Sequence, residues 1–342
     1  MKDIFSKHSK KVLTFVVLIQ LAVIYSLVTF DSANDIHNIN LDSENIQQTD
    51  ETYLDINHFY RINKDYSKGW NEAPGYNVTF KTIINENGLR NKENYSYTKP
   101  EDTFRIGFFG DSFTYGYGVN QSDRWTNLLE DRLNNDLDCK NNFQGINFGV
   151  SGYDTQYSVE MFLQEGQKYD NDLNIFYFTD NDVNFIDDLY REKEEKYLQK
   201  ALAEEGKEDI SELSEETHRT AIETASEEYQ DKRNSMSSLE LREKQISEPL
   251  EALAAEIENP ESIVIFTSHI SEENNQHFRE VSQDLGFEFI TLDKLGPHYN
   301  EKWDHFSYLE EVPDSHSNPE GHKFLSDFVF LDLMSNNMVE CS

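Results

Sequence analysis

The sequence predicts an α/β fold in which helices cover both faces of a parallel sheet. Apolar runs long enough for buried strands alternate with longer amphipathic stretches along most of the chain. The runs are almost continuously apolar, which is typical of strands covered on both faces. Strands are expected at 104–109, 145–150, 173–179, 262–267 and 287–292, and helices at 122–136, 154–168, 272–285 and 318–335.

The first predicted strand ends in residues that can carry chemistry. Its apolar residues 106–109 are followed directly by Gly110, Asp111 and Ser112. A hydroxyl at the carboxyl end of a buried strand lies at the edge where open α/β sheets bind ligands. The helix expected from Trp125 would bring free N–H groups near Ser112, which suits a nucleophile whose product is an oxyanion. An ordinary strand-to-helix turn uses the same residue types, so this motif alone leaves a structural explanation open.

The composition limits the classes of partner. The chain has 342 residues, with 65 acidic against 30 basic side chains and a formal net charge of −35. Such a chain repels nucleic acids and anionic lipid surfaces, so we expect no nucleic-acid partner. The two cysteines, Cys139 and Cys341, lack the spacing of a zinc site. They could pair in an oxidising compartment or remain thiols.

The amino-terminal residues predict a membrane anchor. Four lysines within residues 1–11 precede an apolar run at 12–30, and a run of about 19 residues is near the length that spans a bilayer. The positive-inside rule then leaves 1–11 in the cytoplasm and places the rest in the periplasm or outside the cell. A cleaved secretory signal is the alternative. The run is long for a signal and residues 31–33 form a poor cleavage site, so we expect a retained anchor.

Two segments are expected between the anchor and the sheet. Residues 31–55 are polar, and their composition predicts a stalk between the anchor and the main domain. Residues 56–100 hold aromatic side chains among turn signals, and the alternation over 76–83 predicts a strand or hairpin packed onto the main domain. The main domain itself is expected to span 101–338.

One stretch, at about 186–258, interrupts the alternation of strands and helices. It is dense in Glu and Lys, and its apolar residues, such as Ala221 and Ala225, lie near helical spacing. We expect a long charged helical insertion, a hairpin broken near Gly206 and Pro249. Two interpretations stay open: a solvated excursion, or a lid or partner surface, since the insertion leaves the sheet at the edge that carries Ser112.

Polar residues that complement Ser112 follow the later strands. Gly152 comes after the second strand, Asn181 follows the third, and Asp314 and His316 precede the final helix. A serine hydrolase needs a hydroxyl, a base, an acid that orients the base, and donors for the oxyanion. All four kinds of group are expected at one edge of the sheet. Gly152 suits a backbone N–H donor because substrate can approach a glycine closely.

Other polar residues near this edge have structural explanations. His322 is a rival base, but it falls in the first turns of the final helix. His269 ends the fourth strand, where a single histidine is usually a satisfied polar residue. Asp180 and Asp182 flank Asn181, as acidic pairs often do in loops. Because acyl transfer needs no metal, we expect neither a metal nor another cofactor.

In this order the motifs resemble those of the SGNH (GDSL-like) hydrolases. The four blocks of the family match residues 110–113, 149–153, 181–182 and 314–316, and residues 87–90 match a lead-in common in bacterial members. The likeness covers about residues 85 to 335. It implies a flavodoxin-like three-layer α/β/α sandwich.

The resemblance also implies a role for each matched residue. Ser112 would be the nucleophile, His316 the general base and Asp314 the acid that orients it. The backbone N–H groups of Ser112 and Gly152 and the side chain of Asn181 would form the oxyanion hole.

The chain departs from the family pattern at three places. Phe113 stands for the Leu of the family name, and Thr179 occupies a position that is usually Gly. The last block is Asp-x-His rather than Asp-x-x-His, so Asp314 would approach His316 differently.

Together these features predict a membrane-anchored extracytoplasmic serine esterase that forms an acyl-enzyme on Ser112. Its outward placement and the resemblance point to O-acyl groups on carbohydrate, lipid or a cell-envelope polymer. One alternative is an O-acetyltransferase that modifies exported polysaccharide with the same residues. A second is a non-catalytic binding protein whose charged insertion is the working part.

Overall fold

The computed structural model describes residues 52–54, 60–62, 68–73, 78–183, 186–295, 306–307 and 316–339. The predicted anchor at 12–30, most of the stalk, and Asp314 lie outside these ranges. Within the ranges, no helix combines the length and the apolar character needed to cross a bilayer.

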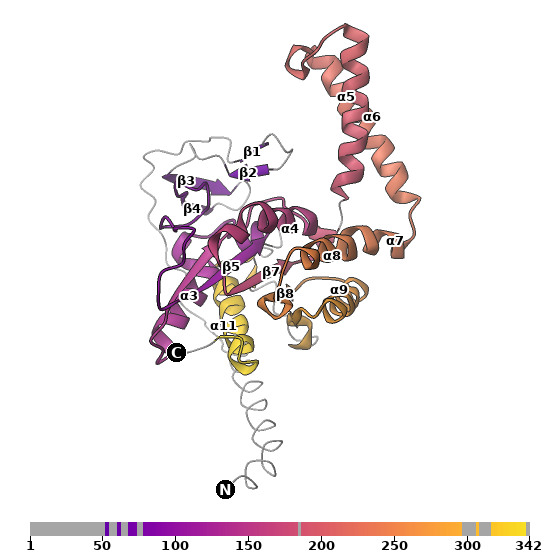
Figure 1. Cartoon of the computed structure of the whole chain (residues 1–342). Coiled ribbons are helices and arrows are strands. Elements are labelled where there is room, and N and C mark those ends of the chain that lie inside the picture. Colours follow the sequence, from indigo (N-terminus) through magenta and orange to yellow (C-terminus); the bar gives the residue numbers. More distant parts are fainter. Residues whose placement is uncertain are drawn as a thin grey trace.

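A five-stranded parallel sheet forms the centre of the protein (Figure 1). Its strands lie side by side in the order β6-β5-β7-β8-β9. Numbered along the chain within the sheet, this is the flavodoxin-like order 2-1-3-4-5, whose switch point lies between the first and third strands. The predicted parallel sheet is confirmed, with strands β5 (Thr103–Gly110), β6 (Asn142–Asn147), β7 (Leu173–Phe178), β8 (Ile263–Thr267) and β9 (Glu288–Thr291).

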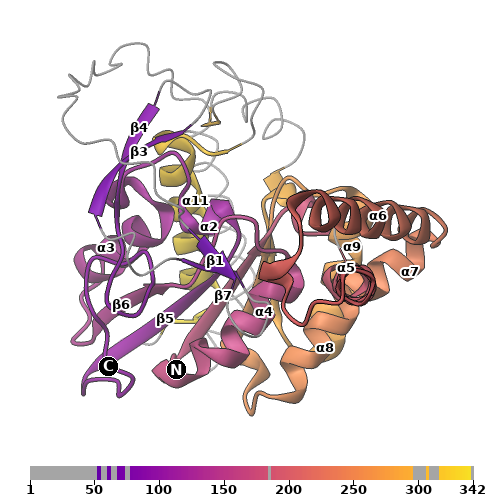
Figure 2. The ribbon, with the colours of Figure 1, turned by 90° about the horizontal axis from the view of Figure 1, so that it is seen from above.

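Helices cover both faces of the sheet, which confirms the three-layer sandwich (Figures 1 and 2). Neighbouring residues of β5 alternate between the faces: Phe108 joins the cluster with α3 and α11, and Phe109 joins the opposite cluster. Phe109 stacks on Phe148 and Phe176 at centroid distances of 4.7 and 4.8 Å. One face carries α3 (Trp125–Asp136) and α11 (Pro319–Ser335), and the other α4 (Thr155–Gln164), α8 (Glu248–Ala255) and α9 (Glu272–Leu285).

The second strand, β6, ends earlier than the sequence predicts. It stops at Asn147 rather than at residue 150. The chain continues along the same direction, because Val150 N still donates to Gly110 O at 3.1 Å. At Gly149 it passes so near the turn after β5 that a Cβ atom there would lie 2.6 Å from Tyr115 N. This close approach replaces strand pairing with packing against the turn that carries Ser112.

A small antiparallel hairpin precedes the sheet. Strands β3 (Lys68–Ala73) and β4 (Val78–Ile83) pair in register, as do the shorter β1 (Thr52–Leu54) and β2 (Tyr60–Ile62). The buried Arg90 then joins this region to the loop after Ser112, since its guanidinium donates to the backbone oxygens of Tyr115 and Gly116. The strand expected over 76–83 is therefore present as β4, and Arg90 anchors the chain that follows it.

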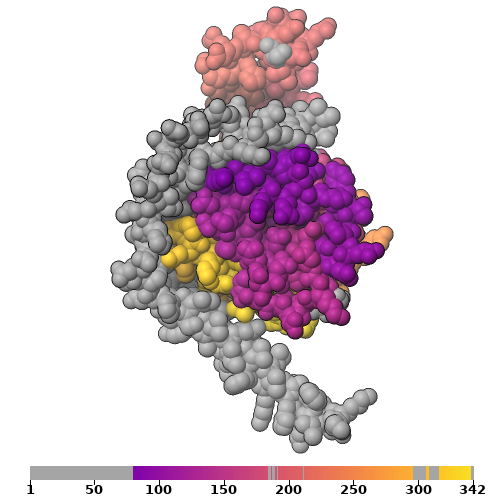
Figure 3. Space-filling view, turned by 90° about the vertical axis from the view of Figure 1, so that its left-hand side faces the viewer, coloured from indigo at the N-terminus to yellow at the C-terminus, as the bar shows by residue number. Residues whose placement is uncertain are grey.

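The charged stretch forms a helical arm, defined here as α5 (Asp187–Glu205) and α6 (Glu215–Asn234). The arm stands clear of the sheet and its covering helices in Figures 1 and 3. Gly206 ends α5 in the left-handed conformation, as expected of a hairpin turn there. The second expected break is wrong: Pro249 lies near the start of α8, and the chain enters α8 directly from a π-helical turn at Glu243–Ser247. The chain instead breaks after α6, before α7 (Ser238–Arg242), which Ser237 and Glu240 start with a capping box.

The two helices of the arm are held together by small residues and by one acidic side chain. Ala201 and Ala221 pack together with Leu198. Glu228 on α6 accepts hydrogen bonds from Lys196 and Tyr197 on α5 at 2.7 and 2.6 Å.

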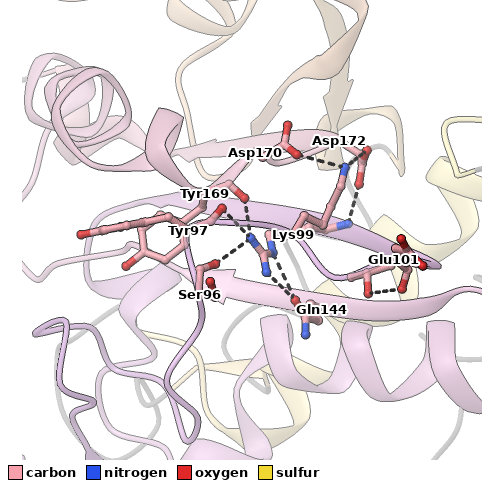
Figure 4. Close-up of polar contacts among 10 residues, drawn as sticks. Ser96, Tyr97, Lys99, Glu101, Gln144, Tyr169, Asp170 and Asp172 are labelled. Atoms are coloured by element: carbon pink, nitrogen blue, oxygen red, sulfur yellow. Dashed lines mark hydrogen bonds and ion pairs between the residues drawn. The ribbon is translucent and has the colours of Figure 1, made fainter.

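A buried arginine, Arg105, fixes the opposite end of the sheet from Ser112. Its partners Ser96, Gln144, Tyr169 and Asp172 are labelled in Figure 4. Arg105, near the start of β5, donates through its guanidinium to Gln144 Oε1 at 2.8 and 3.1 Å and to Ser96 O at 3.1 Å, and also to Tyr169 O. Its backbone N–H donates to Asp172 Oδ2 at 2.8 Å. One planar group therefore ties together the starts of β5 and β6, the segment before them and the loop before β7.

Of the two alternatives for the cysteines, a disulfide or free thiols, the structure shows the disulfide for Cys139. The sequence contains one other cysteine, Cys341, which lies outside the described residues.

Replacing Arg105 with Lys should lower the free energy of unfolding by about 2 kcal/mol. A lysine ammonium cannot match the planar fork, so buried carbonyl acceptors are left without donors. Urea denaturation of the two proteins measures the difference. The matched control is Arg219→Lys on the exposed face of α6, where the ion pair with Glu223 is 3.9 Å long. Equal stabilities for Arg105→Lys and Arg219→Lys would contradict the role given to Arg105.

Candidate active site

The turn that carries Ser112 is dictated by a glycine. Gly110, the last residue of β5, has φ of +147°. A Cβ atom on it would lie 2.5 Å from Thr114 Oγ1 and 2.6 Å from the backbone oxygen of Tyr177. Any other residue would collide with the neighbouring strand, so glycine is required for this turn. Asp111 then caps α2 (Ser112–Tyr115), and its carboxylate accepts from Phe113 N at 2.9 Å.

The helix that begins at Ser112 is therefore α2 and not the helix expected from Trp125. The N–H of Trp125, at the start of α3, is engaged elsewhere and donates to His322 Nδ1 at 3.2 Å. Of the free N–H groups expected at the start of α3, the first is therefore occupied by a side chain from the far end of the chain.

Ser112 and His316 meet although they are far apart in the sequence. The distance between His316 Nε2 and Ser112 Oγ is 2.6 Å. The imidazole ring stacks on Phe113 with a centroid distance of 5.1 Å and lies 5.0 Å from the ring of Tyr117. Both aromatic residues follow Ser112 closely, so the segment that presents the hydroxyl also holds the ring that contacts it. This geometry lets the histidine accept the serine proton.

Asn181 approaches Ser112 from the next strand of the sheet. It lies in the turn Asp180–Val183 after β7, and its Nδ2 donates to Asp111 Oδ2 at 2.8 Å. The same carboxylate oxygen is 3.3 Å from Ser112 Oγ. Asp111 therefore connects the hydroxyl and the amide across the switch point between β5 and β7. Asn181 as a whole residue is exposed, so the turn that carries it lies at the surface.

Gly152 lies in the loop after β6, at the same edge. Val150, two residues earlier, is bonded to Gly110, which places the loop beside the turn of Ser112. Gly152 has φ of +85°, and no atom lies within 4 Å of the position of a Cβ on it. The positive φ and the open space above the residue fit a backbone that a substrate can approach closely.

Two buried carboxyl groups lie beneath this edge. Burial raises the pKa of Asp111, while hydrogen bonds from Asn181 and Phe113 and the nearby His316 oppose the increase. Burial and then the charge of Asp111 raise the pKa of Asp182 well above its ordinary value. Asp111 receives the larger set of donors, because Asp182 Oδ1 is buried and has no hydrogen-bond partner within the described residues. The pair therefore favours a negative charge on Asp111 and a proton on Asp182.

The structure gives the rival histidines structural surroundings. His322 is fully buried in α11, where its ring receives the Trp125 N–H, and it does not contact Ser112 Oγ in the way His316 does. His269 follows β8 with φ of +48°, and its backbone oxygen accepts from Asp180 N at 3.1 Å. Burial lowers the pKa of His269 to about 4. These two residues brace the loops around the site.

The predicted residues are thus brought together in part. Ser112, Asn181 and His316 meet at one edge, and Gly152 lies in the adjoining loop. The role of Asp314 stays a prediction, since this residue lies outside the described ranges. Among the described side chains, no group of three or more His, Cys, Asp or Glu residues is arranged to hold a metal ion.

Sequence reasoning did not identify the residues that hold this group in place. In the sequence, Asp111 is part of the Ser112 motif, Phe113 and Thr179 are departures from the family pattern, and Tyr117 belongs to no motif. Asp111, Phe113 and Tyr117 lie within five residues of Ser112, and Thr179 lies two residues before Asn181. Closeness in sequence to a candidate site residue is therefore the signal that could have identified them.

Comparisons with known proteins show the family of the chain and similar solved structures. The model of the GDSL-like lipase/acylhydrolase family matches residues 108–324. No curated protein matches the chain. Similar solved structures include the psychrotrophic esterase EstA from a Pseudoalteromonas species (12% identity, 68% of this chain and 98% of that chain, TM-score 0.42). A lipase/acylhydrolase from Enterococcus faecalis is similar at 16% identity, over 70% and 99% of the two chains, with a TM-score of 0.42. A two-domain esterase active on acetylated mannans is similar at 15% identity, over 68% of this chain and 50% of that chain, with a TM-score of 0.38.

His322 should make the stability of the fold sensitive to acid. Burial, and then the positive charges of Arg90 and Arg124, lower its pKa to about 3. In the unfolded chain a histidine titrates near about 6.5. Below that pH the unfolded chain takes up a proton that the folded chain refuses, so stability falls as the pH falls from about 6.5 towards 3.

We therefore expect wild type to lose about 2 kcal/mol of stability relative to His322→Asn between pH 7.5 and pH 5. Asparagine keeps an acceptor for the Trp125 N–H but has no proton to take up. Chemical denaturation at the two pH values measures the change. His218→Asn, at an exposed position on α6, is the control and should follow wild type. A pH-independent difference between wild type and His322→Asn would refute the assignment.

Proposed function

The chain belongs to the GDSL-like lipase/acylhydrolase family and is an esterase, and on this premise we propose that Ser112 is its nucleophile. The observation that carries the proposal is the 2.6 Å contact between Ser112 Oγ and His316 Nε2. A hydroxyl is a weak nucleophile unless a neighbouring base removes its proton, and His316 is placed to do so.

In the first half of the reaction, Ser112 Oγ attacks the ester carbonyl carbon while its proton passes to His316 Nε2. The carbonyl oxygen becomes an oxyanion, which the N–H groups of Ser112 and Gly152 and the Nδ2 of Asn181 would stabilise. Collapse of this intermediate breaks the ester C–O bond. The leaving alcohol takes the proton from His316, and the acyl group stays on Ser112.

In the second half, water replaces the alcohol. His316 accepts a proton from the water as its oxygen attacks the acyl-enzyme, and the same oxyanion donors are used again. The proton returns to Ser112 Oγ as the carboxylic acid leaves, so the enzyme is restored. In this scheme Phe113 and Tyr117 hold the imidazole ring, and Asp314 is the proposed acid that orients it.

We further propose O-acylated carbohydrate or a neutral cell-envelope polymer as the substrate, with the enzyme anchored outside the cytoplasm. The net charge of −35 disfavours anionic substrates. The apolar run at 12–30 and the disulfide of Cys139 both support an oxidising, extracytoplasmic location. Recovery of the full chain as a cytoplasmic soluble protein would count against this location.

A fluorophosphonate probe tests the nucleophile. The probe should label Ser112 in the wild-type chain, and the labelled peptide is mapped by mass spectrometry. Ser112→Ala and His316→Ala should both lose the label, because one lacks the hydroxyl and the other the base that activates it. His218→Ala, at an exposed position on α6, is the matched control and should be labelled normally. Folded wild-type protein without label on Ser112 would reject the proposed mechanism.

The substrate class is tested with acetylated oligosaccharides. Wild type should release acetate, and Ser112→Ala should not. Adding an unacetylated oligosaccharide in competition with water shows where the acetyl group goes. Release of free acetate is the expected outcome, whereas acetylation of the added oligosaccharide would identify a transferase that uses the same residues.

A further inference from the structure

Thr179 contacts the proposed side-chain donor of the oxyanion hole. It follows β7 directly and its side chain is 2% exposed. Its hydroxyl donates to Asn181 Oδ1 in a close hydrogen bond. At its other end, the Asn181 amide donates through Nδ2 to Asp111 Oδ2 at 2.8 Å. The amide is thus held at both ends, by residues from two neighbouring strand ends.

The orientation of this amide decides what it can do. Its oxygen and nitrogen ends have nearly the same shape but opposite hydrogen-bonding character. Nδ2 carries two hydrogens, of which one is used by Asp111 and the other is left for an oxyanion. A flipped amide would present an oxygen to the developing negative charge and would repel it.

We propose that Thr179 is a positioning residue that fixes the Asn181 amide with its N–H end towards the substrate oxygen. The inference rests on the proposed function, because it assigns Thr179 to the oxyanion hole of that reaction. Thr179 itself touches neither substrate nor the reacting atoms.

The single hydroxyl proton of Thr179 has two acceptors in reach. Asn181 Oδ1 is the nearer, while Asp182 Oδ2 lies 3.2 Å away and already accepts from Thr179 N at 2.6 Å. Burial and the charge of Asp111 raise the pKa of Asp182 well above its ordinary value, and a neutral carboxyl attracts the proton less than a carboxylate does. Both effects direct the proton to Asn181.

Asp111 alone does not provide the same control. A carboxylate there accepts only from Nδ2, but a protonated Asp111 could also donate to the amide oxygen and so tolerate the flipped amide. The Thr179 hydroxyl adds a donor at the oxygen end of the amide, so both ends of the Asn181 side chain are fixed.

Thr179→Val keeps the shape of the side chain and removes its hydroxyl. With p-nitrophenyl acetate, we expect kcat to fall about tenfold and KM to change little, because the lost contact acts on the transition state. Thr179→Ser restores the hydroxyl and should recover kcat to within about twofold of wild type. Unchanged kcat in Thr179→Val would overturn the proposal. If the valine variant does not fold, Thr179→Ala against Thr179→Ser makes the same comparison.

Thr267→Val is the matched control. Thr267, at the end of β8, is also fully buried, and its hydroxyl donates to an asparagine oxygen, Asn275 Oδ1, at 2.7 Å. Removing this hydroxyl deletes the same kind of bond away from Asn181. We expect a similar loss of stability in Thr267→Val and Thr179→Val, and a loss of kcat only in the latter. Equal losses of kcat would overturn the proposal, because they would show a general effect of deleting a buried hydroxyl.

A double-mutant cycle with Asn181 isolates the route of the effect. Asn181→Ala should lower kcat about a hundredfold, and Thr179→Val should add no further loss in that background. A tenfold loss in both backgrounds would show that Thr179 acts through another group and would overturn the proposal. If the wild-type protein is active and labelled on Ser112 but Thr179→Val is equally active, the role of Thr179 is refuted and the proposed function is not. Wild type without serine labelling refutes both proposals.

Discussion

The site depends on the absence of a side chain at Gly110. The last residue of β5 passes so close to the backbone of β7 that a Cβ atom would lie 2.6 Å from the oxygen of Tyr177. The chain can therefore leave the sheet at once, with Asp111 as the cap and Ser112 as the first residue of α2. Because β5 and β7 are neighbours in the sheet, the same close approach brings the turn after β7 beside Ser112.

Burial of polar groups is the cost of this arrangement. Asp111 and Asp182 lie beneath the sheet edge, and burial raises the pKa of both. Carboxyl groups in such surroundings destabilise a fold unless donors surround them. Asp111 obtains its donors from Phe113 and Asn181, and Ser112 Oγ lies 3.3 Å from its Oδ2, so the groups that stabilise its charge surround the proposed reaction. Stability and the geometry of the site therefore rest on the same hydrogen bonds.

The histidine reaches the serine from the far end of the chain, and helix packing makes this possible. α11, which follows His316, packs on α3 against one face of the sheet. His322 joins the two helices by accepting the first N–H of α3. Phe113 and Tyr117 then flank the ring of His316. A residue expected as a rival base thus contributes to the placement of the base, and aromatic side chains next to Ser112 complete it.

The sequence by itself determined the five strands, the helices between them and the meeting of Ser112, Asn181 and His316 at one edge. These features depend on local patterns, since buried parallel strands are continuously apolar and their carboxyl ends share an edge. Only the tertiary structure decided the strand order, the contact of Asn181 with Asp111, the hydrogen bond from Trp125 to His322, and the arm standing clear of the sheet. Those two hydrogen bonds join residues 70 and 197 positions apart. Contacts at such separations depend on how strands and helices pack, and no pattern of neighbouring residues contains that information.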